Sequence, residues 1–466
     1  MQRSVIRNKE VLLGKGDQNA RERVVYMLER VLATMNSRNR IVELMRLDGD
    51  TLHVGNRCWD LSKKRHIYLF GAGKAVNAMA GAVCDILGDR ITRGIISVKI
   101  AEPEDRYVNT EVYIGGHPLP NQAGMQAAKA ILEMIDSAGP QDLFISVFSG
   151  GSSALLTYPV EGITLEDEIA AQDQLLKSGA KILEINAVRR HISQTNGGWL
   201  AKRIEDKGAE LITLMIGDSV GASVTGDRNE PKHFWGTMVA PDGTTIQDAR
   251  NTITNYALQD TLPKRVVDYI MDDRRVRETP KEQFEHVTTF VLDNVPDSCE
   301  EAEKVAKEMG IPLMVLTTFI EGESREVGIC MASICREIRF CKRPIKPPCY
   351  VAFSGETTTS VNGSCTGKGG PSQELVLGFS LGVRNFSGIA IASVDTEGTD
   401  GTTCYAGGIA DTLTCDRLEA AGGNTYDALR RHASADALEL ISDNIFTGNT
   451  GTNVCDFNII FIDADE

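Results

Sequence analysis

Lysine, serine and carboxylate side chains stand beside glycine in four stretches of this sequence, where they could bind or transfer a charged group. The four stretches are IYLFGAGKAV (67–76), SVFSGGSSALL (146–156), AFSGETTTS (352–360) and ASVDTEGTDGTTCYAGG (392–408). Glycine lets the backbone approach a ligand closely and adopt positive φ. Free N–H groups at helix starts attract phosphates and carboxylates. Four such stretches in one chain favour a site for a phosphorylated ligand over four empty turns.

The first stretch matches neither of the common nucleotide-binding motifs. A dinucleotide fingerprint, G-x-G-x-x-G, begins at Gly71 and Gly73 but has Val76 in place of its third glycine, and the next apolar run, GIISVKI, ends near a lysine rather than an acid. A Walker-type loop would need Ser or Thr at Ala75. What remains is Lys74, in the first turn of a predicted helix beside a glycine turn. Such a lysine suits neutralising a transferring phosphoryl group, although a solvated lysine at a helix start is the alternative.

The second stretch supplies hydroxyl groups and free backbone amides between a predicted strand and a predicted helix. Its residues are Ser149, Gly150, Gly151, Ser152 and Ser153. Further along, NAVRRHIS contains Arg189 and Arg190, and either guanidinium could bind a carboxylate with two parallel hydrogen bonds. Each arginine could equally form a surface salt bridge. No serine lies in a G-x-S-x-G elbow, so the sequence does not support a hydrolase triad.

The third and fourth stretches supply carboxylates. Asp395, Glu397 and Asp400 lie within six residues of one another. Carboxylates at a strand end can hold Mg²⁺ through one or two oxygens, with water and phosphate completing the shell. One of them could instead accept the proton of a substrate hydroxyl, and an acidic solvated loop is the remaining alternative. Glu356, in SGETT, is a further candidate ligand.

The elements that must position these residues alternate between strand and helix. Apolar runs such as HIYLFGAG, RGIISVKI, DLFISVFSGG and LITLMIGD are separated by helical patterns such as NQAGMQAAKAILEMID. This rhythm predicts an α/β fold with a mostly parallel sheet covered by helices on both faces. In such a sheet, ligands bind at the carboxyl ends of the strands.

The length of 466 residues predicts two domains. The charged connector RRVRETPKEQFEH places the boundary between an N-terminal α/β domain, residues 1–275, and a C-terminal α/β domain, residues 276–466. After this connector, TTFVLDN, SCEEAEKVAKEMG and PLMVLTTF predict another βαβ unit, and Asn362-Gly363 predicts a hairpin turn.

Composition narrows the function classes. The net charge of −15 argues against nucleic acid and anionic membranes as partners. No run of 18 apolar residues predicts a membrane helix, and the first residues lack the apolar region of a secretory signal. Eleven cysteines with no CxxC pair suggest free thiols and a cytoplasmic location.

Taken in order, the motifs resemble the class II glycerate 2-kinase family, whose C-terminal module is called MOFRL and whose members have often been labelled hydroxypyruvate reductase. The matching segments are GAGKA, GGHPLPN, SGGSSALL, KSGAKILEINAVRRHIS with GGWLA, IEGESREVG, SGETTTSVNG, GKGGPSQE, EGTDGTTCYAGGIAD and TGNTGTNVCD. The resemblance implies a Rossmann-like N-terminal domain, a MOFRL-type module at about residues 347–466, and an active site in the cleft between the two domains.

The resemblance also implies transfer of the γ-phosphoryl group of ATP to the 2-hydroxyl of glycerate, with Mg²⁺, giving 2-phosphoglycerate. On this reading the catalytic residues are Lys74, Asp400 and Asp395, and the metal ligands are Asp395, Asp400 and Glu356. Substrate or phosphate would be bound by Ser149, Gly150, Gly151, Ser152, Ser153, Asn186 and Arg190. The nucleotide would be bound by Gly71, Gly73, Gly355, Glu356, Thr357, Gly369, Gly370, Gln373 and Glu374. The partners would be a small hydroxy acid and ATP, with a homodimer as one assembly.

Three positions depart from the family pattern at the expected site. Pro371 stands where the family has an arginine regarded as catalytically important, and proline offers neither charge nor donor. Cys404 replaces an acid, and Asn196 replaces a lysine. These departures keep three alternatives open: a kinase for another hydroxy or sugar acid, a hydroxypyruvate-reductase-like enzyme, and a degenerate member that binds a metabolite without turnover.

Overall fold

The computed structural model describes residues 4–102, 105–221, 226–234, 236–361 and 365–464. The chain forms two compact units. The central unit comprises residues Arg40–Ile216 and Val224–Leu292, and the terminal unit comprises Met1–Asn39, Gly217–Ser223 and Asp293–Glu466.

Within the described residues, no helix is long and apolar enough to cross a membrane. All eleven cysteines are free thiols.

The central unit contains a six-stranded sheet in the order β6-β5-β4-β7-β8-β9. Its strands are β4 (His66–Ala72), β5 (Arg93–Val98), β6 (Thr110–Ile114), β7 (Asp142–Phe148), β8 (Glu210–Ile216) and β9 (Val287–Asp293). Strands β4 to β8 pair in parallel. Leu211 N–H donates to His286 O and Gly217 N–H donates to Asp293 O, so β9 continues the sheet in the same direction. The predicted parallel sheet is confirmed.

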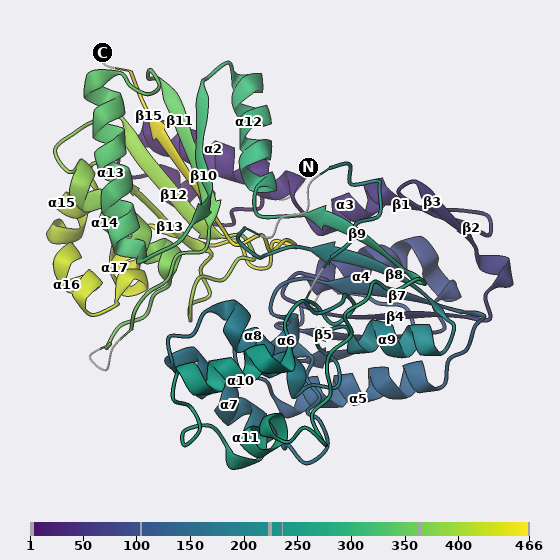
Figure 1. The fold of residues 1–466 in the computed structure, drawn as a ribbon. Coiled ribbons are helices and arrows are strands. Elements are labelled where there is room, and N and C mark those ends of the chain that lie inside the picture. The colour runs from purple at the N-terminus through teal and green to yellow at the C-terminus, as the bar shows by residue number, and fades with distance from the viewer. Residues whose placement is uncertain (1–3, 103–104, 222–225, 235, 362–364, 465–466) are drawn as a thin grey trace. The chain divides into compact units, whose positions relative to one another are not determined.

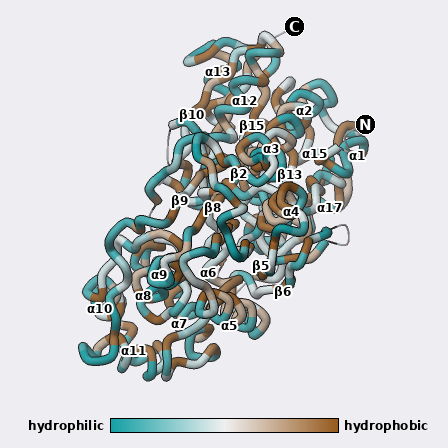
Figure 2. The backbone as a smooth tube through the Cα atoms, turned by 90° about the vertical axis from the view of Figure 1, so that its right-hand side faces the viewer, coloured by the Kyte–Doolittle hydropathy of each residue, from teal (hydrophilic) through white to brown (hydrophobic). Residues whose placement is uncertain are grey.

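Helices cover both faces of this sheet, which explains why its inner strands are apolar throughout. Helix α4 (Val76–Leu87) packs on β4, β5 and β7, while α5 (Gln122–Asp136) and α9 (Trp199–Asp206) lie on the opposite face (Figure 1). Helix α4 is hydrophobic along most of its length (Figure 2), because it is buried between the sheet and the small antiparallel sheet of β1 (Met45–Asp48), β2 (Thr51–Val54) and β3 (Arg57–Asp60).

Most of the remaining helices of the central unit form a separate apolar cluster, whereas α6 (Ser152–Leu155) packs in the core of the parallel sheet through Leu155. The bounds of the others are α7 (Leu165–Lys177), α8 (Ile182–His191), α10 (Ile246–Asn255) and α11 (Lys264–Met271), with 3₁₀ turns η1 (Leu61–Lys63) and η2 (Gly88–Arg90) elsewhere in the unit. Apolar side chains of α7, α8, α10 and α11 form one core of their own. The stretch NYALQDTLPKRVVDYIMDD, whose apolar spacing predicts a helix, is the end of α10, a loop and α11.

The terminal unit contains a mixed sheet in the order β10-β11-β15-β12-β13-β14. Its strands are β10 (Leu313–Ile320), β11 (Cys349–Gly355), β12 (Ile389–Asp395), β13 (Gly407–Asp411), β14 (Asn444–Ile445) and β15 (Asp456–Ile462). Its helices are α1 (Lys9–Leu13), α2 (Gln18–Thr34), α12 (Asp297–Met309), α13 (Ser324–Cys341), α14 (Pro371–Val383), α15 (Thr414–Ala420), α16 (Thr425–Arg430) and α17 (Ser434–Leu440), and α3 (Ser37–Leu44) leads into the central unit. Helices α13 and α14 cover one face of the sheet, and α2 and α12 cover the other (Figure 1).

Two features differ from the organisation expected from sequence. The boundary was placed at residues 275 and 276, but residues 1–39 belong to the terminal unit because α2 packs on β12 and β15. There the fully buried Arg21 donates to both carboxylate oxygens of Asp443, at 2.8 and 2.7 Å.

The predicted βαβ unit after the connector is wrong. Its two strands, β9 and β10, lie in different sheets, so the chain passes from one unit to the other between them. The apolar runs are correct as strands, but periodicity within a run does not say which sheet it joins. The predicted hairpin turn at Asn362-Gly363 lies outside the described residues.

Candidate active-site residues

The turn that carries Lys74 is tied to the neighbouring serine-glycine turn. Strands β4 and β7 are adjacent and parallel, with Gly71 opposite Val147. Beyond their carboxyl ends, Lys74 N–H donates to Gly150 O at 3.0 Å and Ala75 N–H donates to Ser149 Oγ at 3.0 Å. Two stretches that are 74 residues apart in sequence therefore form one polar surface at the end of the sheet.

Glycine is required at two points of this double turn. A Cβ on Gly73, whose φ is +149°, would lie 2.2 Å from Ser149 Oγ. A Cβ on Gly151, whose φ is +82°, would lie 2.9 Å from His117 Cδ2 and 3.2 Å from Lys74 Cγ. All three distances are shorter than normal contacts of a Cβ atom, so a side chain at Gly73 or Gly151 would push the turns apart. The half-buried Lys74 and His117 thus flank the same glycine, and His117 was not among the predicted site residues.

Asn196 is joined to this surface through Ser153. Its Nδ2 donates to Ser153 Oγ at 2.9 Å, and the residue is only 5% exposed. The family lysine expected at this position would bring a charge next to the serine, whereas asparagine brings a neutral donor. The departure at Asn196 therefore changes the electrostatics of the serine-glycine turn.

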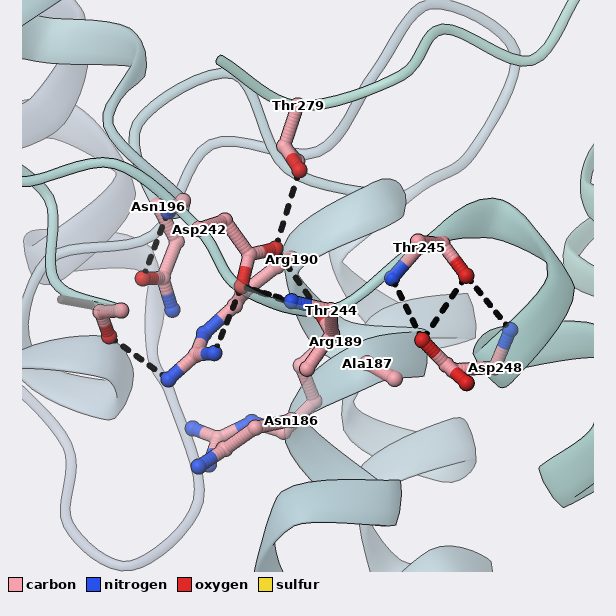
Figure 3. Close-up of polar contacts among 12 residues, drawn as sticks. Asn186, Ala187, Arg189, Arg190, Asn196, Asp242, Thr244, Thr245, Asp248 and Thr279 are labelled. Carbon is pink, nitrogen blue, oxygen red and sulfur yellow. Dashed lines mark hydrogen bonds and ion pairs between the residues drawn. The ribbon is translucent and has the colours of Figure 1, made fainter. Parts of the chain in front are cut away.

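Arg190 is bound within the protein interior (Figure 3). It is 8% exposed, its Nη1 donates to Asp242 Oδ1 at 2.8 Å, and its Nη2 donates to Gly236 O at 2.6 Å. Burial opposes ionisation of Asp242, but the charge of Arg190 and hydrogen bonds from Thr244 and Thr279 lower its pKa below the ordinary value. Both outer nitrogens of Arg190 are therefore engaged by protein acceptors, which leaves little of its guanidinium for a substrate carboxylate.

Arg189 is placed differently. Its Nη1 donates to Asn186 Oδ1 at 3.3 Å, and the two side chains extend in the same direction (Figure 3). Burial lowers the pKa of Arg189, and the charge of Glu168 partly offsets this effect. Among the described residues, no carboxylate forms an ion pair with Arg189. Of the two arginines, Arg189 is the one with donors left for an anion.

Glu168, on α7, is the buried acid that faces Arg189 electrostatically. Burial raises its pKa to about 7, and the hydrogen bond from Thr157 and the charge of Arg189 lessen this rise. Its Oε2 has no hydrogen-bond partner among the described residues. Thr157, which donates to Glu168, directly follows the second glycine-containing stretch, SVFSGGSSALL (146–156). The sequence analysis missed Glu168, because a glutamate on an amphipathic helix normally faces solvent.

In the terminal unit, Asp400 caps helix α14. Its Oδ1 accepts from Ser372 N–H at 3.2 Å and its Oδ2 accepts from Gln373 N–H at 2.8 Å. Pro371 occupies the first helical position, where the missing N–H costs nothing. Burial, with smaller contributions from Glu374 and Glu397, raises the pKa of Asp400 to about 7 despite the two N–H bonds. Both oxygens of this predicted metal ligand thus already have protein donors.

The loop before α14 approaches its neighbours at backbone distance. A Cβ on Gly370 would lie 2.2 Å from Asp400 Oδ1, and a Cβ on Gly369 would lie 2.0 Å from Ser434 Oγ. The side chains of Gln373 and Glu374 are buried, the first donating to Asn444 Oδ1 at 2.9 Å and the second bonded to His432 at 2.8 Å. These two side chains pack in the interior of the unit, so neither is left to contact a nucleotide.

A group of carboxylates gathers where β11 and β12 end and β15 begins. Asp456, the first residue of β15, is the register partner of Gly355 in β11 and of Asp395 in β12. Burial, followed by the charges of Asp395, Asp400 and Glu356, raises the pKa of Asp456 well above its ordinary value. Thr357 N–H points to Asp456 Oδ2 at 3.5 Å. The sequence analysis missed Asp456, because only the register of β15 brings it to this position.

These carboxylates do not form a closed metal cage. Within the described part of the chain, no group of three or more His, Cys, Asp or Glu side chains is arranged to hold a metal ion. Mg²⁺ that accompanies a nucleotide needs only one or two protein carboxylates. The arrangement therefore fits a cation shared with phosphates better than a cation held by protein alone.

Comparisons with known proteins agree with this architecture. The model of a domain of unknown function, DUF4147, matches residues 23–271, and the MOFRL family model matches residues 349–456. The D-glycerate 2-kinase of Thermotoga maritima is 35% identical over 84% of this chain and 90% of its own length. The glycerate 2-kinase of Pyrococcus horikoshii is 36% identical over 89% of this chain and 91% of its own length.

A solved structure gives the same result. The crystal structure of glycerate kinase from Thermotoga maritima superposes with a TM-score of 0.75 at 32% identity, covering 94% of this chain and 98% of the other. Family model, sequence identity and fold thus agree over nearly the whole length. This chain, which carries the DUF4147 and MOFRL regions in this order, is therefore a member of the glycerate 2-kinase family.

Proposed function

We propose that this protein is a kinase that transfers the γ-phosphoryl group of ATP to the 2-hydroxyl of glycerate, giving 2-phosphoglycerate. One observation carries the proposal: the chain matches glycerate 2-kinases over most of its length, and Lys74, which the family resemblance makes catalytic, lies on a turn bonded to a serine-glycine turn. The hydroxyl oxygen attacks the γ-phosphorus, the bond to the ADP oxygen breaks, and the hydroxyl proton passes to a carboxylate.

Lys74 binds the transferring phosphoryl group. Its ammonium neutralises charge that builds up on the equatorial oxygens in the transition state. The backbone amides and hydroxyls of residues 149–153 bind further anionic oxygens. His117, which flanks Gly151 with Lys74, is a second donor for the same group.

Arg189 and Asn186 bind the carboxylate of the acceptor. Arg189, at the end of α8, keeps donors that no described carboxylate uses, whereas Arg190 is bound to Asp242 and Gly236. A guanidinium binds a carboxylate in a planar two-bond geometry that lysine cannot reproduce. Arg190 then acts as a positioning residue, because it fixes the end of α8 from which Arg189 extends.

Asp395, with Glu356 or Asp456 as a second ligand, would hold the Mg²⁺ that accompanies ATP. Burial, followed by the charges of Asp395, Asp400 and Glu356, raises the pKa of Asp456, and a divalent cation would offset this concentration of negative charge, which supports the assignment. When bound, the ion neutralises charge on the phosphates. Asp395 is a better ligand or proton acceptor than Asp400, since both oxygens of Asp400 accept backbone N–H groups.

A different acceptor is the second candidate function, and Asn196 favours it. A neutral amide donates to Ser153 at the position of the family lysine. This change reduces the positive charge next to the turn and would suit an acceptor with an additional hydroxyl group, such as a larger sugar acid.

An ADP-release assay over a panel of hydroxy acids tests both candidates. Wild type should release ADP fastest with glycerate, and Lys74→Ala should abolish this while the exposed-lysine variant Lys129→Ala retains it. A sugar acid that outperforms glycerate would select the second candidate. Release that survives in Lys74→Ala would overturn the assignment of the lysine.

A further inference from the structure

A cavity of about 560 Å³ lies in the central unit, and none of the predicted site residues lines it. It is formed by residues of β3, by residues 231–234 and 239–241, and by residues 283–285 and 287–289 just before and at the start of β9. Sites for small organic ligands typically have volumes of about 300–1,000 Å³. The cavity is therefore large enough for a metabolite.

Backbone hydrogen bonds hold the walls of this cavity together. Asn56 N–H, in the turn before β3, donates to Asn229 O at 2.8 Å, and Lys232 N–H donates to Thr289 O at 2.7 Å. The second bond is part of an isolated antiparallel bridge between Lys232 and Thr289 at the edge of the sheet. The three segments are thus bonded to one another and not merely adjacent.

The lining carries unpaired positive charge. Among the described residues, neither Arg57 nor Lys232 forms an ion pair or side-chain hydrogen bond. Lys232 contributes to lowering the pKa of Asp227, but makes no ion pair with it. His233, bonded to Gln283 at 3.3 Å, lies beside them, and Glu285 is the one carboxylate among the described lining residues. In a chain of net charge −15, the side chains of Arg57 and Lys232 thus form a local region of positive charge that can bind an anion.

Three aromatic side chains contribute to the remaining wall. Trp59, Phe234 and Phe284 all line the cavity, and each is half-buried. Aromatic faces bind flat rings by stacking, and a cation close to such a face binds the phosphate attached to the ring. Two cations and three aromatic side chains around one cavity match a ligand that combines a phosphate with a planar base.

The cavity lies at the opposite end of the sheet from Lys74. Val287, Thr288 and Thr289, which line it, are the first residues of β9. Lys74 follows the carboxyl end of β4, and all strands between them run in the same direction. A strand of seven residues spans about 20 Å, so a ligand in the cavity does not contact Lys74.

We propose that this cavity is a second binding site, separate from the kinase site, for a nucleoside monophosphate. The phosphate binds Arg57 and Lys232, and the base stacks among Trp59, Phe234 and Phe284. The observations that carry it are the cavity, its two cations without ion-pair partners and its aromatic wall, so it does not depend on which acid the kinase phosphorylates.

Protection of Cys58 from alkylation tests the site, because this exposed thiol lines the cavity. AMP is the probe, and labelling is read by mass spectrometry of the Cys58 peptide, with the exposed Cys330 as internal control. AMP should slow labelling of Cys58 several-fold without affecting Cys330, both in wild type and in Lys74→Ala, and saturating ATP analogue with Mg²⁺ should not remove the effect.

Variants of the two cations complete the test. The double substitution Arg57→Ala, Lys232→Ala should weaken AMP protection at least tenfold, and Trp59→Leu should weaken it separately. ADP release with glycerate should remain near wild type in both variants, which shows that they fold. Unchanged protection in the double variant, protection lost in Lys74→Ala, or equal protection by adenosine or by inorganic phosphate alone would each overturn the proposal.

Discussion

The carboxylate of Asp400 accepts the backbone N–H of Gln373 at 2.8 Å, although the two residues are 27 positions apart. A second oxygen accepts from Ser372 N–H, so the start of α14 is capped by a residue from a separate loop. Unpaired N–H groups at a helix start normally need such a partner. The loop that the family resemblance assigns to the nucleotide is therefore held in place by Asp400.

Replacement of Asp400 should destabilise the terminal unit. Asp400→Ala leaves two buried N–H groups without acceptors, which costs about 1–3 kcal/mol for each unsatisfied group. Asp400→Asn keeps one acceptor oxygen and should lose less. Thermal denaturation measures this difference, with Asp427→Ala as a control, because among the described residues the partly exposed Asp427 pairs only with surface arginines. Wild-type stability in Asp400→Ala combined with a raised requirement for Mg²⁺ would show instead that Asp400 is a metal ligand.

Replacement of Lys74 should remove phosphoryl transfer and leave folding unchanged. Lys74 is half-buried at a loop, so Lys74→Ala removes charge and little packing. Loss of one preorganised charge at a phosphoryl group lowers kcat by about 10²–10³-fold. Steady-state kinetics measures kcat, and the melting temperature serves as the control. A large fall in the melting temperature would mean that the lysine mainly supports the turn.

The two adjacent arginines should have opposite effects. Arg190→Ala leaves Asp242 buried without its charge partner, which costs about 3–5 kcal/mol of folding free energy. Arg189→Ala breaks no ion pair and should instead raise the KM for the acceptor at least tenfold, with little change in the melting temperature or in the KM for ATP. An Arg189→Ala enzyme with a normal KM for every acceptor would contradict its role in carboxylate binding.

Glu168 should make stability depend on pH. Its pKa is raised to about 7 in the folded protein, above the ordinary value for glutamate, so the folded state binds a proton that the unfolded state has released. Stability from this group is present at low pH and declines as pH rises from about 4.5 through 7. By linkage the decline is on the order of 3 kcal/mol.

Glu168→Gln isolates this effect. The amide cannot ionise, so the variant should keep its stability across the same pH range, and the difference between the two unfolding free energies should grow towards pH 8. Denaturant unfolding at several pH values gives these free energies. Parallel pH curves for wild type and variant would show that Glu168 keeps its ordinary pKa.

Local features of the site could be predicted from sequence, because they depend on neighbouring residues. The turn of Gly71, Gly73 and Lys74 follows from an apolar run, two glycines and a helical pattern in order. The parallel arrangement of β4 and β7 then brings this turn to Ser149, as expected for strands that end at one edge of a sheet.

Features that depend on distant pairing could not be predicted in the same way. Asp242 lies 52 positions from Arg190, and nothing near either residue marks them as partners. Asp456 reaches Asp395 only because the last strand inserts between β11 and β12. Likewise, an acidic loop looks the same in sequence whether Asp400 faces a metal ion or caps a helix.

The most direct test of the central claim is identification of the phosphorylated product. Enzyme, ATP, Mg²⁺ and D-glycerate are incubated, and the product is analysed by ³¹P NMR against authentic 2- and 3-phosphoglycerate, with Lys74→Ala run in parallel. We predict 2-phosphoglycerate with wild type and about 10²–10³-fold slower formation of it with the variant. Formation of 3-phosphoglycerate, or no phosphorylated glycerate from a folded wild-type enzyme, would contradict the account.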